Sequence, residues 1–205
     1  MEEELNKIKS KCLSCQKCSL YKSRTNLVFS DGVITNKMML IGEAPGFNED
    51  QEGVPFVGRS GKLLDQIFES VGLNRKDNFY ICNTIKCRPP QNRNPLPEEK
   101  LACREYLDAQ ISILKPKIII LCGAVAVSSM LDTKLGITKI RGQWFKGPFD
   151  SKMMPIFHPS YLLRNPTKEK GGPKWLMWQD VKEIKRVYYY KLGQIIILIY
   201  FIRII

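Results

Sequence analysis

Five of the seven cysteines in this 205-residue chain have spacings that suit a metal centre. Cys12 and Cys15 form a C-x2-C pair, Cys18 follows after two more residues, and Cys87 and Cys103 lie far downstream. A C-x2-C pair brings two thiolates to one centre, and distant cysteines complete the ligand set through the fold. The bacterial ferredoxin pattern fails because its next cysteine is absent. Zinc is a weaker alternative, because a zinc ribbon needs a second C-x2-C pair.

Three polar residues stand directly after apolar runs, where they could serve a reaction. Glu43 lies in Gly-Glu-Ala-Pro-Gly (residues 42–46), Asn83 follows the second run, and His158, the only histidine, opens His-Pro-Ser. A carboxylate can hold water, an amide offers both a donor and an acceptor, and an imidazole can donate to a ligand. The glycines and proline of residues 42–46 suit a tight turn close to a ligand. Their spacing matches neither G-x-G-x-x-G nor a Walker loop, so nucleotide-cofactor binding has little support.

The elements that must position these residues are visible as short apolar runs at 38–41, 79–82, 118–121 and 153–157. Such runs are typical of strands buried on both faces of a parallel sheet, where Cys82 and Cys122 are expected to be core residues. Helical spacing in 61–71 and the proline and acids that open 97–114 predict crossover helices. We therefore expect an α/β fold, a three-layer α/β/α sandwich around a short, mainly parallel central sheet. Its strand ends should bring the three polar residues together.

The charge of the chain favours an anionic partner. Lysine and arginine number 32 against 20 acidic residues, a formal charge of +12. Such an excess favours a polyanion or an anionic membrane surface, although simple solubility is an alternative reason. The polar start MEEELNKIKS lacks the apolar core of a secretory signal. We therefore expect a cytoplasmic protein, in which clustered cysteines bind metal more often than they form disulfides.

The carboxyl-terminal segment differs from the rest of the chain. We expect one domain over residues 1–194 and an apolar tail of unknown role over residues 195–205, with Arg203 as its only charge. As a helix the tail is too short to cross a bilayer, which takes roughly 20 residues. An extra strand or a docked terminal helix is the favoured interpretation, and no membrane partner is expected.

Three motifs in order, Gly-Glu-Ala-Pro-Gly, Lys-Cys-Arg-Pro-Pro and His-Pro-Ser, together with the C-x2-C pair, resemble the family 4 uracil-DNA glycosylases. The resemblance covers roughly residues 10 to 185. It implies a monofunctional, monomeric repair enzyme that hydrolyses the N-glycosidic bond of deoxyuridine in single- or double-stranded DNA and leaves an abasic site. It also implies a four-iron, four-sulfur cluster. The ligands that it implies are Cys12, Cys15, Cys87 and Cys103, with Cys18 as a nearby non-ligand that a local rearrangement could use.

The same resemblance implies roles for the pocket residues. Glu43 becomes the candidate for holding water, because Ala44 stands where the commonest uracil glycosylases have an aspartate. His158 would donate to uracil O2, where charge develops as the bond breaks. The uracil-binding residues would be Gly42, Glu49 as a gate against the thymine methyl group, Phe56 as a stacking partner, Asn83 as the reader of O4 and N3-H, and His158.

The DNA-binding residues implied by the resemblance surround these motifs. Leu162 would fill the gap left by the flipped base, as apolar wedges do in DNA benders. The residues expected to contact DNA beside it are Arg59, Ser60, Lys86, Arg88, Ser160 and Arg164. The main alternative of another class is an iron-sulfur DNA-binding or redox-sensing module without glycosylase activity.

Overall fold

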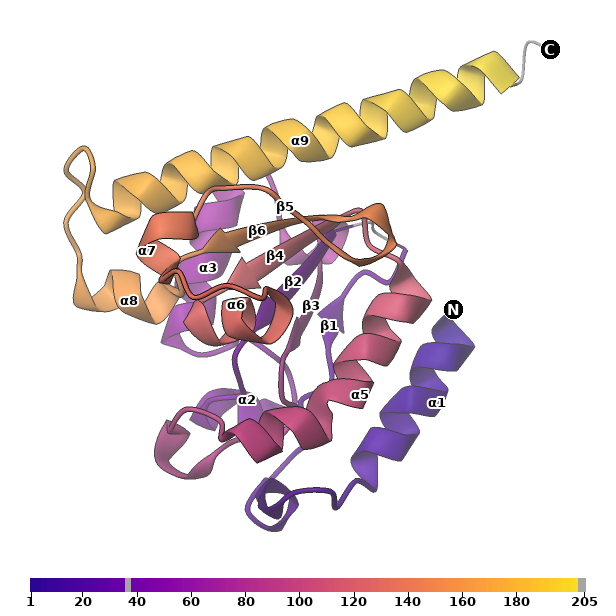
Figure 1. The fold of residues 1–205 in the computed structure, drawn as a ribbon, viewed down its shortest axis with the longest axis vertical. Helices are drawn as coiled ribbons and strands as arrows, with labels where there is room; N and C mark the ends of the chain where they lie inside the picture. Colours follow the sequence, from indigo (N-terminus) through magenta and orange to yellow (C-terminus); the bar gives the residue numbers. More distant parts are fainter. Residues whose placement is uncertain (36–37, 203–205) are drawn as a thin grey trace.

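The protein is an α/β sandwich around one six-stranded sheet, in a computed structural model that describes residues 1–35 and 38–202 (Figure 1). The four central strands are parallel, and each lies within one residue of its predicted run. They are β3 (Tyr80–Asn83), β2 (Met38–Gly42), β4 (Ile118–Cys122) and β6 (Lys152–Ile156), in that spatial order. The predicted mainly parallel sheet is thereby confirmed.

Two antiparallel edge strands were not predicted. They are β1 (Asp31–Gly32), which pairs with β3, and β5 (Phe145–Lys146), which pairs with β6. Each has only two residues, too few for an alternating or continuous apolar pattern to appear in the sequence.

The apolar runs form strands because both faces of the sheet are covered. Successive side chains of a strand point to opposite faces. Met38 and Leu40 pack into one core cluster, whereas Met39 and Ile41 pack into the other. Cys82 and Cys122, both 0% exposed, lie in the cores of opposite faces, as predicted.

Helices cover the two faces separately. The first face carries α3 (Arg59–Glu69), α8 (Pro159–Arg164) and α9 (Pro173–Ile202). The second carries α5 (Pro97–Leu114), α6 (Ala124–Met130) and α1 (Glu2–Leu13), which packs against α5. Figure 1 shows α9 on one side of the sheet and α5 with α1 on the other, so the three layers agree with the prediction. Short helices α2 (Phe47–Glu52), α4 (Arg75–Asn78) and α7 (Ile137–Ile140) lie in the connections.

The apolar tail continues α9 through Ile202, and residues 203–205 lie outside the described part. Residues 195–202 therefore form the end of a terminal helix and not an extra strand. Figure 1 shows the last turns of α9 extending beyond the sheet. Within residues 1–35 and 38–202, none of the helices combines the length and apolar character needed to cross a membrane.

Candidate functional site

The carboxyl ends of the parallel strands surround a cavity of about 670 Å³. Because β3 and β4 flank β2 on opposite sides, the turn after β2 lies where the strand order reverses, the usual ligand position in open α/β sheets. The volume is within the range of roughly 300 to 1,000 Å³ found for small-molecule sites. The predicted site residues that line it are Glu43, Glu49, Phe56, Ser60, Asn83, His158, Ser160 and Arg164.

Gly42 ends β2 and leaves room for two side chains to meet. In the sheet register it is the partner of Asn83. A Cβ atom on residue 42 would lie 2.4 Å from Asn83 Oδ1 and 2.4 Å from Phe56 Cζ. Both distances are far below van der Waals contact, so any larger residue would displace the amide and the ring. The buried wall of the cavity is therefore an amide beside an aromatic ring.

Phe56 holds its place through an unusual backbone conformation. Its φ is 57°, in the left-handed region that residues other than glycine seldom adopt. Arg75 stabilises this loop, because Nη2 donates to the carbonyl of Phe56 at 2.7 Å and Nη1 to that of Pro55 at 3.0 Å. Arg75 is itself paired with Asp31 and Asp65. Sequence reasoning missed Arg75, which belongs to no motif.

His158 is a half-buried imidazole at the start of α8, and its ring centroid lies 6.1 Å from that of Phe56. Its Nδ1 accepts the backbone N–H of Ser160 at 3.2 Å and lies 2.8 Å from the Ser160 hydroxyl. Because Nδ1 is an acceptor, the proton of the neutral ring is on Nε2. Burial, and then the charge of Arg164, lower the pKa of His158 to about 4, although Glu49 opposes the shift. The ring is therefore neutral at pH 7 and keeps one N–H for a ligand.

Glu43 is a carboxylate on the cavity wall whose charge is weakly solvated. Burial raises its pKa above the usual value, and nearby Lys100 opposes the shift. Its backbone is fixed by the loop after β3, because the carbonyl accepts the N–H of Ile85 at 3.3 Å and the hydroxyl of Thr84. A carboxylate of this kind can accept a proton from water.

Glu49 binds backbone on both sides of the cavity mouth. One oxygen accepts the N–H groups of Val57 at 3.0 Å and Gly58 at 2.8 Å, and the other accepts that of Gly46 at 3.1 Å. The side chain thus ties the turn after β2 to the loop that carries Phe56. These bonds fix the position of the carboxylate, while its action as a gate against thymine stays a prediction.

Two of the predicted DNA contacts lie outside the cavity but beside it. Arg59 is exposed at the first turn of α3. Arg88 is half-buried, its Nε donates to Asn92 at 2.7 Å, and its guanidinium lies 5.0 Å from the ring of the exposed Phe47.

The prediction that Lys86 contacts DNA is wrong. Its side chain is 0% exposed, and its amino group donates to the carbonyl of Asn83 and to Gln110, both at 2.7 Å. A side chain enclosed in this way cannot reach a phosphate.

The prediction that Leu162 is the DNA wedge is also wrong. Leu162 is 0% exposed and packs in the core cluster beneath α3 and α9. Its neighbour Leu163 is partly exposed. Consecutive residues of a helix point about 100° apart, so docking of α8 on the core decides which leucine is buried.

A further wall of the cavity comes from the loop over residues 89–94, of which Pro89, Asn92, Arg93 and Asn94 line it. Gln91 and Asn92 both have left-handed φ values, 53° and 55°. Arg93 is anchored by Glu99, with Nη2 and Oε1 2.6 Å apart. The signal for this loop was the proline-rich stretch after Cys87, which marks irregular backbone without showing where it lies.

Five thiols line a second, smaller cavity between the loop after α1, the loop after β3 and α5. They are Cys12, Cys15, Cys18, Cys87 and Cys103. Burial, and then the charges of the other thiols, raise the pKa of Cys12. Burial raises the pKa of Cys103 to about 11. Ionised thiolates here therefore require a bound positive centre.

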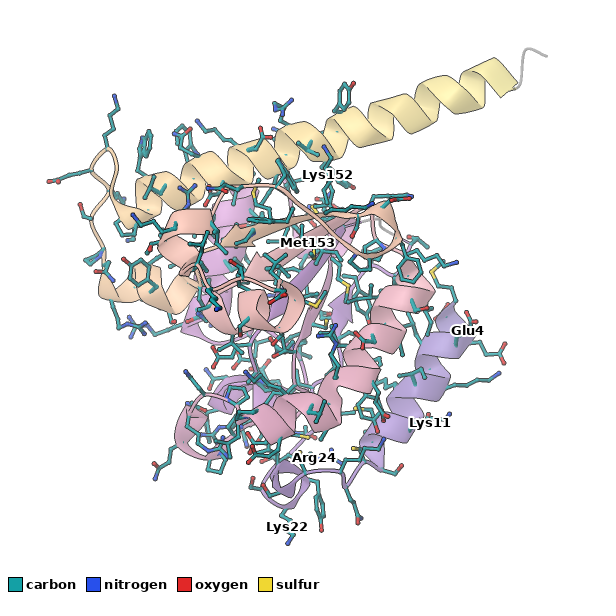
Figure 2. The ribbon with its side chains drawn as sticks, in the orientation of Figure 1. Glu4, Lys11, Lys22, Arg24, Lys152 and Met153 are labelled. Atoms are coloured by element: carbon teal, nitrogen blue, oxygen red, sulfur yellow. The ribbon has the colours of Figure 1, made fainter. Side chains whose placement is uncertain are left out.

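The donor set of the cavity is all sulfur, which suits zinc or an iron-sulfur cluster. Among the residues that the structure describes, no three His, Cys, Asp or Glu side chains are arranged to hold one metal ion. Arg24 lies beside the loop after α1, where its Nη1 donates to Cys87 Sγ at 3.2 Å and its Nη2 to the carbonyl of Leu13 (Figure 2). Arg24 and Lys86 both border the thiols, and their charges complement an anionic group.

Comparisons with known proteins agree with this geometry. A family model of the uracil DNA glycosylase superfamily matches residues 29–182. A type-4 uracil-DNA glycosylase of Thermotoga maritima is 42% identical over 188 residues, which are 90% of this chain and 94% of that protein. One of Sulfurisphaera tokodaii is 42% identical over 193 residues, 90% of this chain and 85% of that protein. The chain therefore belongs to the type-4 uracil-DNA glycosylases of the uracil DNA glycosylase superfamily.

Proposed function

We propose that the protein hydrolyses the N-glycosidic bond of deoxyuridine in DNA, releasing uracil and leaving an abasic site. The observation that carries this proposal is the convergence of Glu43, Phe56, Asn83 and His158 on one cavity at the switch point of the sheet. An amide beside an aromatic ring suits a flat pyrimidine that offers a carbonyl and an N–H, and the neutral imidazole adds a second donor.

His158 stabilises the departing base. As the bond to the sugar lengthens, negative charge develops on uracil O2, and the Nε2 proton of the neutral ring donates to it. A neutral donor held by Ser160 needs no reorganisation during the reaction, and loss of such a donor typically costs on the order of 10²- to 10³-fold in rate. The low pKa of the ring supports donation of a hydrogen bond without transfer of a proton.

Glu43 positions the attacking water. The reaction passes through an oxocarbenium-like sugar, which captures water with little base assistance, so one carboxylate suffices although residue 44 is alanine. Among the described residues that line the cavity none is a lysine, which supports a monofunctional enzyme because a lyase needs an amine nucleophile there.

DNA contacts are assigned from exposure and position. Ser60, Ser160 and Arg164 border the cavity, and Arg59 and Arg88 lie beside it. Leu163, partly exposed on α8, replaces Leu162 as the side chain that fills the gap in the duplex. The charge of +12 supports binding that weakens as salt rises.

The thiol cavity is proposed to hold a four-iron, four-sulfur cluster with a structural role. The proposed ligands are the four that the resemblance implies, Cys12, Cys15, Cys87 and Cys103, and Cys18 is the fifth thiol of the cavity. Cys12 lies within α1, 1% exposed, in a cluster with Phe29 and Tyr106 against which Cys15 and Cys103 pack. Cys18 lies in extended backbone and packs with Cys87 and Cys103. When bound, the cluster supplies a cross-link among three segments of the chain.

A single-turnover assay on DNA with one uracil tests the proposed activity. Wild-type protein in excess should convert the uracil strand to an abasic strand, while His158→Ala loses activity and still binds DNA. DNA binding without base release by the wild type would instead indicate the alternative, an iron-sulfur DNA-binding or redox-sensing module. The same assay with single-stranded and duplex substrates determines the strand preference.

Cytoplasmic location and a monomeric state are also proposed. The free thiols among the described residues, five of them gathered at one cavity, support the former. Cell fractionation and size-exclusion chromatography of the anaerobically purified protein test the two proposals.

A further inference from the structure

Lys86 is a lysine whose every polar group is engaged inside the protein. Its amino group donates to the carbonyl of Asn83 and to Gln110 Oε1, both at 2.7 Å. Its backbone N–H donates to the thiol of Cys103, and its carbonyl accepts the N–H of Val28 at 3.0 Å. The residue thus touches both the uracil-pocket strand and the thiol cavity.

The amino group has no carboxylate beside it. None of the ion pairs within residues 1–35 and 38–202 includes Lys86, although its side chain is 0% exposed. A buried cation without a countercharge strongly destabilises the folded state. Lys86 borders the thiol cavity, and four thiolates around an iron-sulfur cluster carry the compensating negative charge.

The hydrogen bond from Lys86 to the Asn83 carbonyl lies in the backbone of the residue that is proposed to read the base. Asn83 is the last residue of β3, and the chain turns immediately after it, with the N–H groups of Thr84 and Ile85 bonded to the carbonyls of Gly42 and Glu43. The peptide group after Asn83 thus bonds to β2 through its N–H, and Lys86 satisfies its carbonyl from three residues downstream. Holding that carbonyl fixes the backbone from which the Asn83 amide projects.

We propose that Lys86 is a positioning residue that couples the iron-sulfur segment to uracil recognition by Asn83. The cluster makes burial of the amino group favourable, the amino group holds the Asn83 carbonyl, and the Asn83 side chain reads the base. This inference rests on the proposed function, because it assumes that Asn83 contacts uracil.

Lys86→Met tests the coupling, since methionine has a side chain of similar length without the amino group. Lys117→Met is the matched control, because Lys117 is exposed and precedes β4 at the opposite end of the sheet. The probe is duplex DNA with 2′-fluoro-2′-deoxyuridine, which resists cleavage, compared with the same duplex containing thymidine. The readouts are iron per chain, thermal unfolding, and affinity for each duplex by fluorescence anisotropy.

We expect Lys86→Met to keep its iron and its affinity for thymidine DNA, and to lose roughly tenfold to hundredfold in affinity for the uracil duplex, as misplaced hydrogen bonds of 1 to 3 kcal/mol imply. Lys117→Met should match the wild type in every readout. A Lys86→Met protein that retains iron and still binds the uracil duplex as tightly as the wild type would overturn the inference.

Gln110→Leu keeps the inference testable if Lys86→Met fails to fold or loses iron. It removes one acceptor of the amino group from α5, away from the cluster ligands in sequence, and should reduce uracil preference in the same direction but by less. Unchanged uracil preference in this variant, with iron retained, overturns the coupling. Absence of uracil preference in the wild type would instead contradict the proposed function, and this inference with it.

Discussion

At the scale of single residues, burial gives ordinary side chains their chemical roles. His158 is held neutral because its ring is shielded from water and lies near Arg164, and Ser160 directs its proton to Nε2. Asn83, 2% exposed, is held by the sheet register and by Lys86. Each polar atom is thus held in a fixed orientation, which would make the binding of a wrong base costly.

The first prediction concerns the titration of His158. As the only histidine, it should give a single set of imidazole signals in proton-nitrogen NMR spectra, with an apparent pKa near 4 and the Nε2–H tautomer above it. The unfolded chain takes up this proton near about pH 6.5. The folded state binds fewer protons between these values, so the contribution of His158 to stability falls as pH drops from 6.5 toward 4. Arg164→Gln should raise the pKa, and an unshifted wild-type value would contradict the neutral-donor role.

The second prediction concerns the choice between uracil and cytosine. Cytosine presents an amino donor at C4 and a bare acceptor at N3, the reverse of uracil, so the Asn83 amide leaves polar groups unpaired at a cost of about 1 to 3 kcal/mol each. Asn83→Asp should weaken uracil excision and admit some cytosine excision, most readily in mismatches. His158→Ala, its control, should slow excision of every base without changing the preference. Excision of uracil by Asn83→Asp at the wild-type rate would remove Asn83 as the reader.

At the scale of elements, the loop after α1 brings cysteines to the thiol cavity, and the docking of helix α8 sets which of its two leucines is buried. The loop after α1 brings Cys15 and Cys18 to the cavity that Cys12 reaches from within the helix. Helix α8 buries one leucine of a pair and leaves the other partly exposed. The placement of the cysteines and that of the leucines both follow from how α1 packs against α5 and how α8 packs against the sheet. The spacing of residues in the sequence does not reveal this packing.

The third prediction separates the two candidate thiols. Anaerobically purified wild-type protein should be brown, and Cys12→Ser should lose most of its iron because one iron of the cluster then has no thiolate. Cys18→Ser, a conservative change in the same cavity, should retain iron and the visible absorbance. The reverse result would make Cys18 the ligand in place of Cys12, and stoichiometric zinc in a colourless protein would refute the cluster.

The fourth prediction separates the leucines of α8. Leu162→Ala should reduce the free energy of unfolding by about 2 to 5 kcal/mol, because it leaves a cavity in the core. Leu163→Ala should change stability by less than about 0.5 kcal/mol. On duplex uracil DNA, however, Leu163→Ala should lower kcat/KM by about tenfold, equivalent to about 1.4 kcal/mol, with a smaller effect on single strands that leave no gap to fill. Equal losses on both substrates would argue against a wedge.

At the scale of the whole molecule, the cluster segment and the glycosylase pocket form one structure. Cys87 follows β3 closely and Cys103 lies in α5, so the proposed cross-link between them and the segment at the end of α1 would restrain the strand that carries Asn83. On the opposite face, α9 contributes Met177, Val181, Ile184, Val187 and Tyr188 to the core, all before the apolar tail.

The fifth prediction concerns that tail. Removal of residues 195–205 should leave uracil excision and the melting temperature close to those of the full chain, because the described core contacts of α9 end at Tyr188. A second truncation that also removes residues 181–194 is the control and should unfold the protein, since it deletes buried Val181 and Ile184. Unfolding of the shorter truncation would show that the tail belongs to the core.

The sequence alone determined the central strands, the two long crossover helices and the family, because apolar runs buried on both faces and motifs at strand ends are local properties. It also determined that Glu43, Asn83 and His158 share one edge of the sheet. Only the tertiary structure decided that Lys86 and Leu162 are buried, that Cys18 lies with the other thiols, and that Arg75 supports Phe56. These outcomes depend on which face of an element packs against its neighbours. The identity of a lysine or leucine in a motif does not show whether its side chain faces the core or the solvent, because that depends on contacts between segments far apart in the sequence.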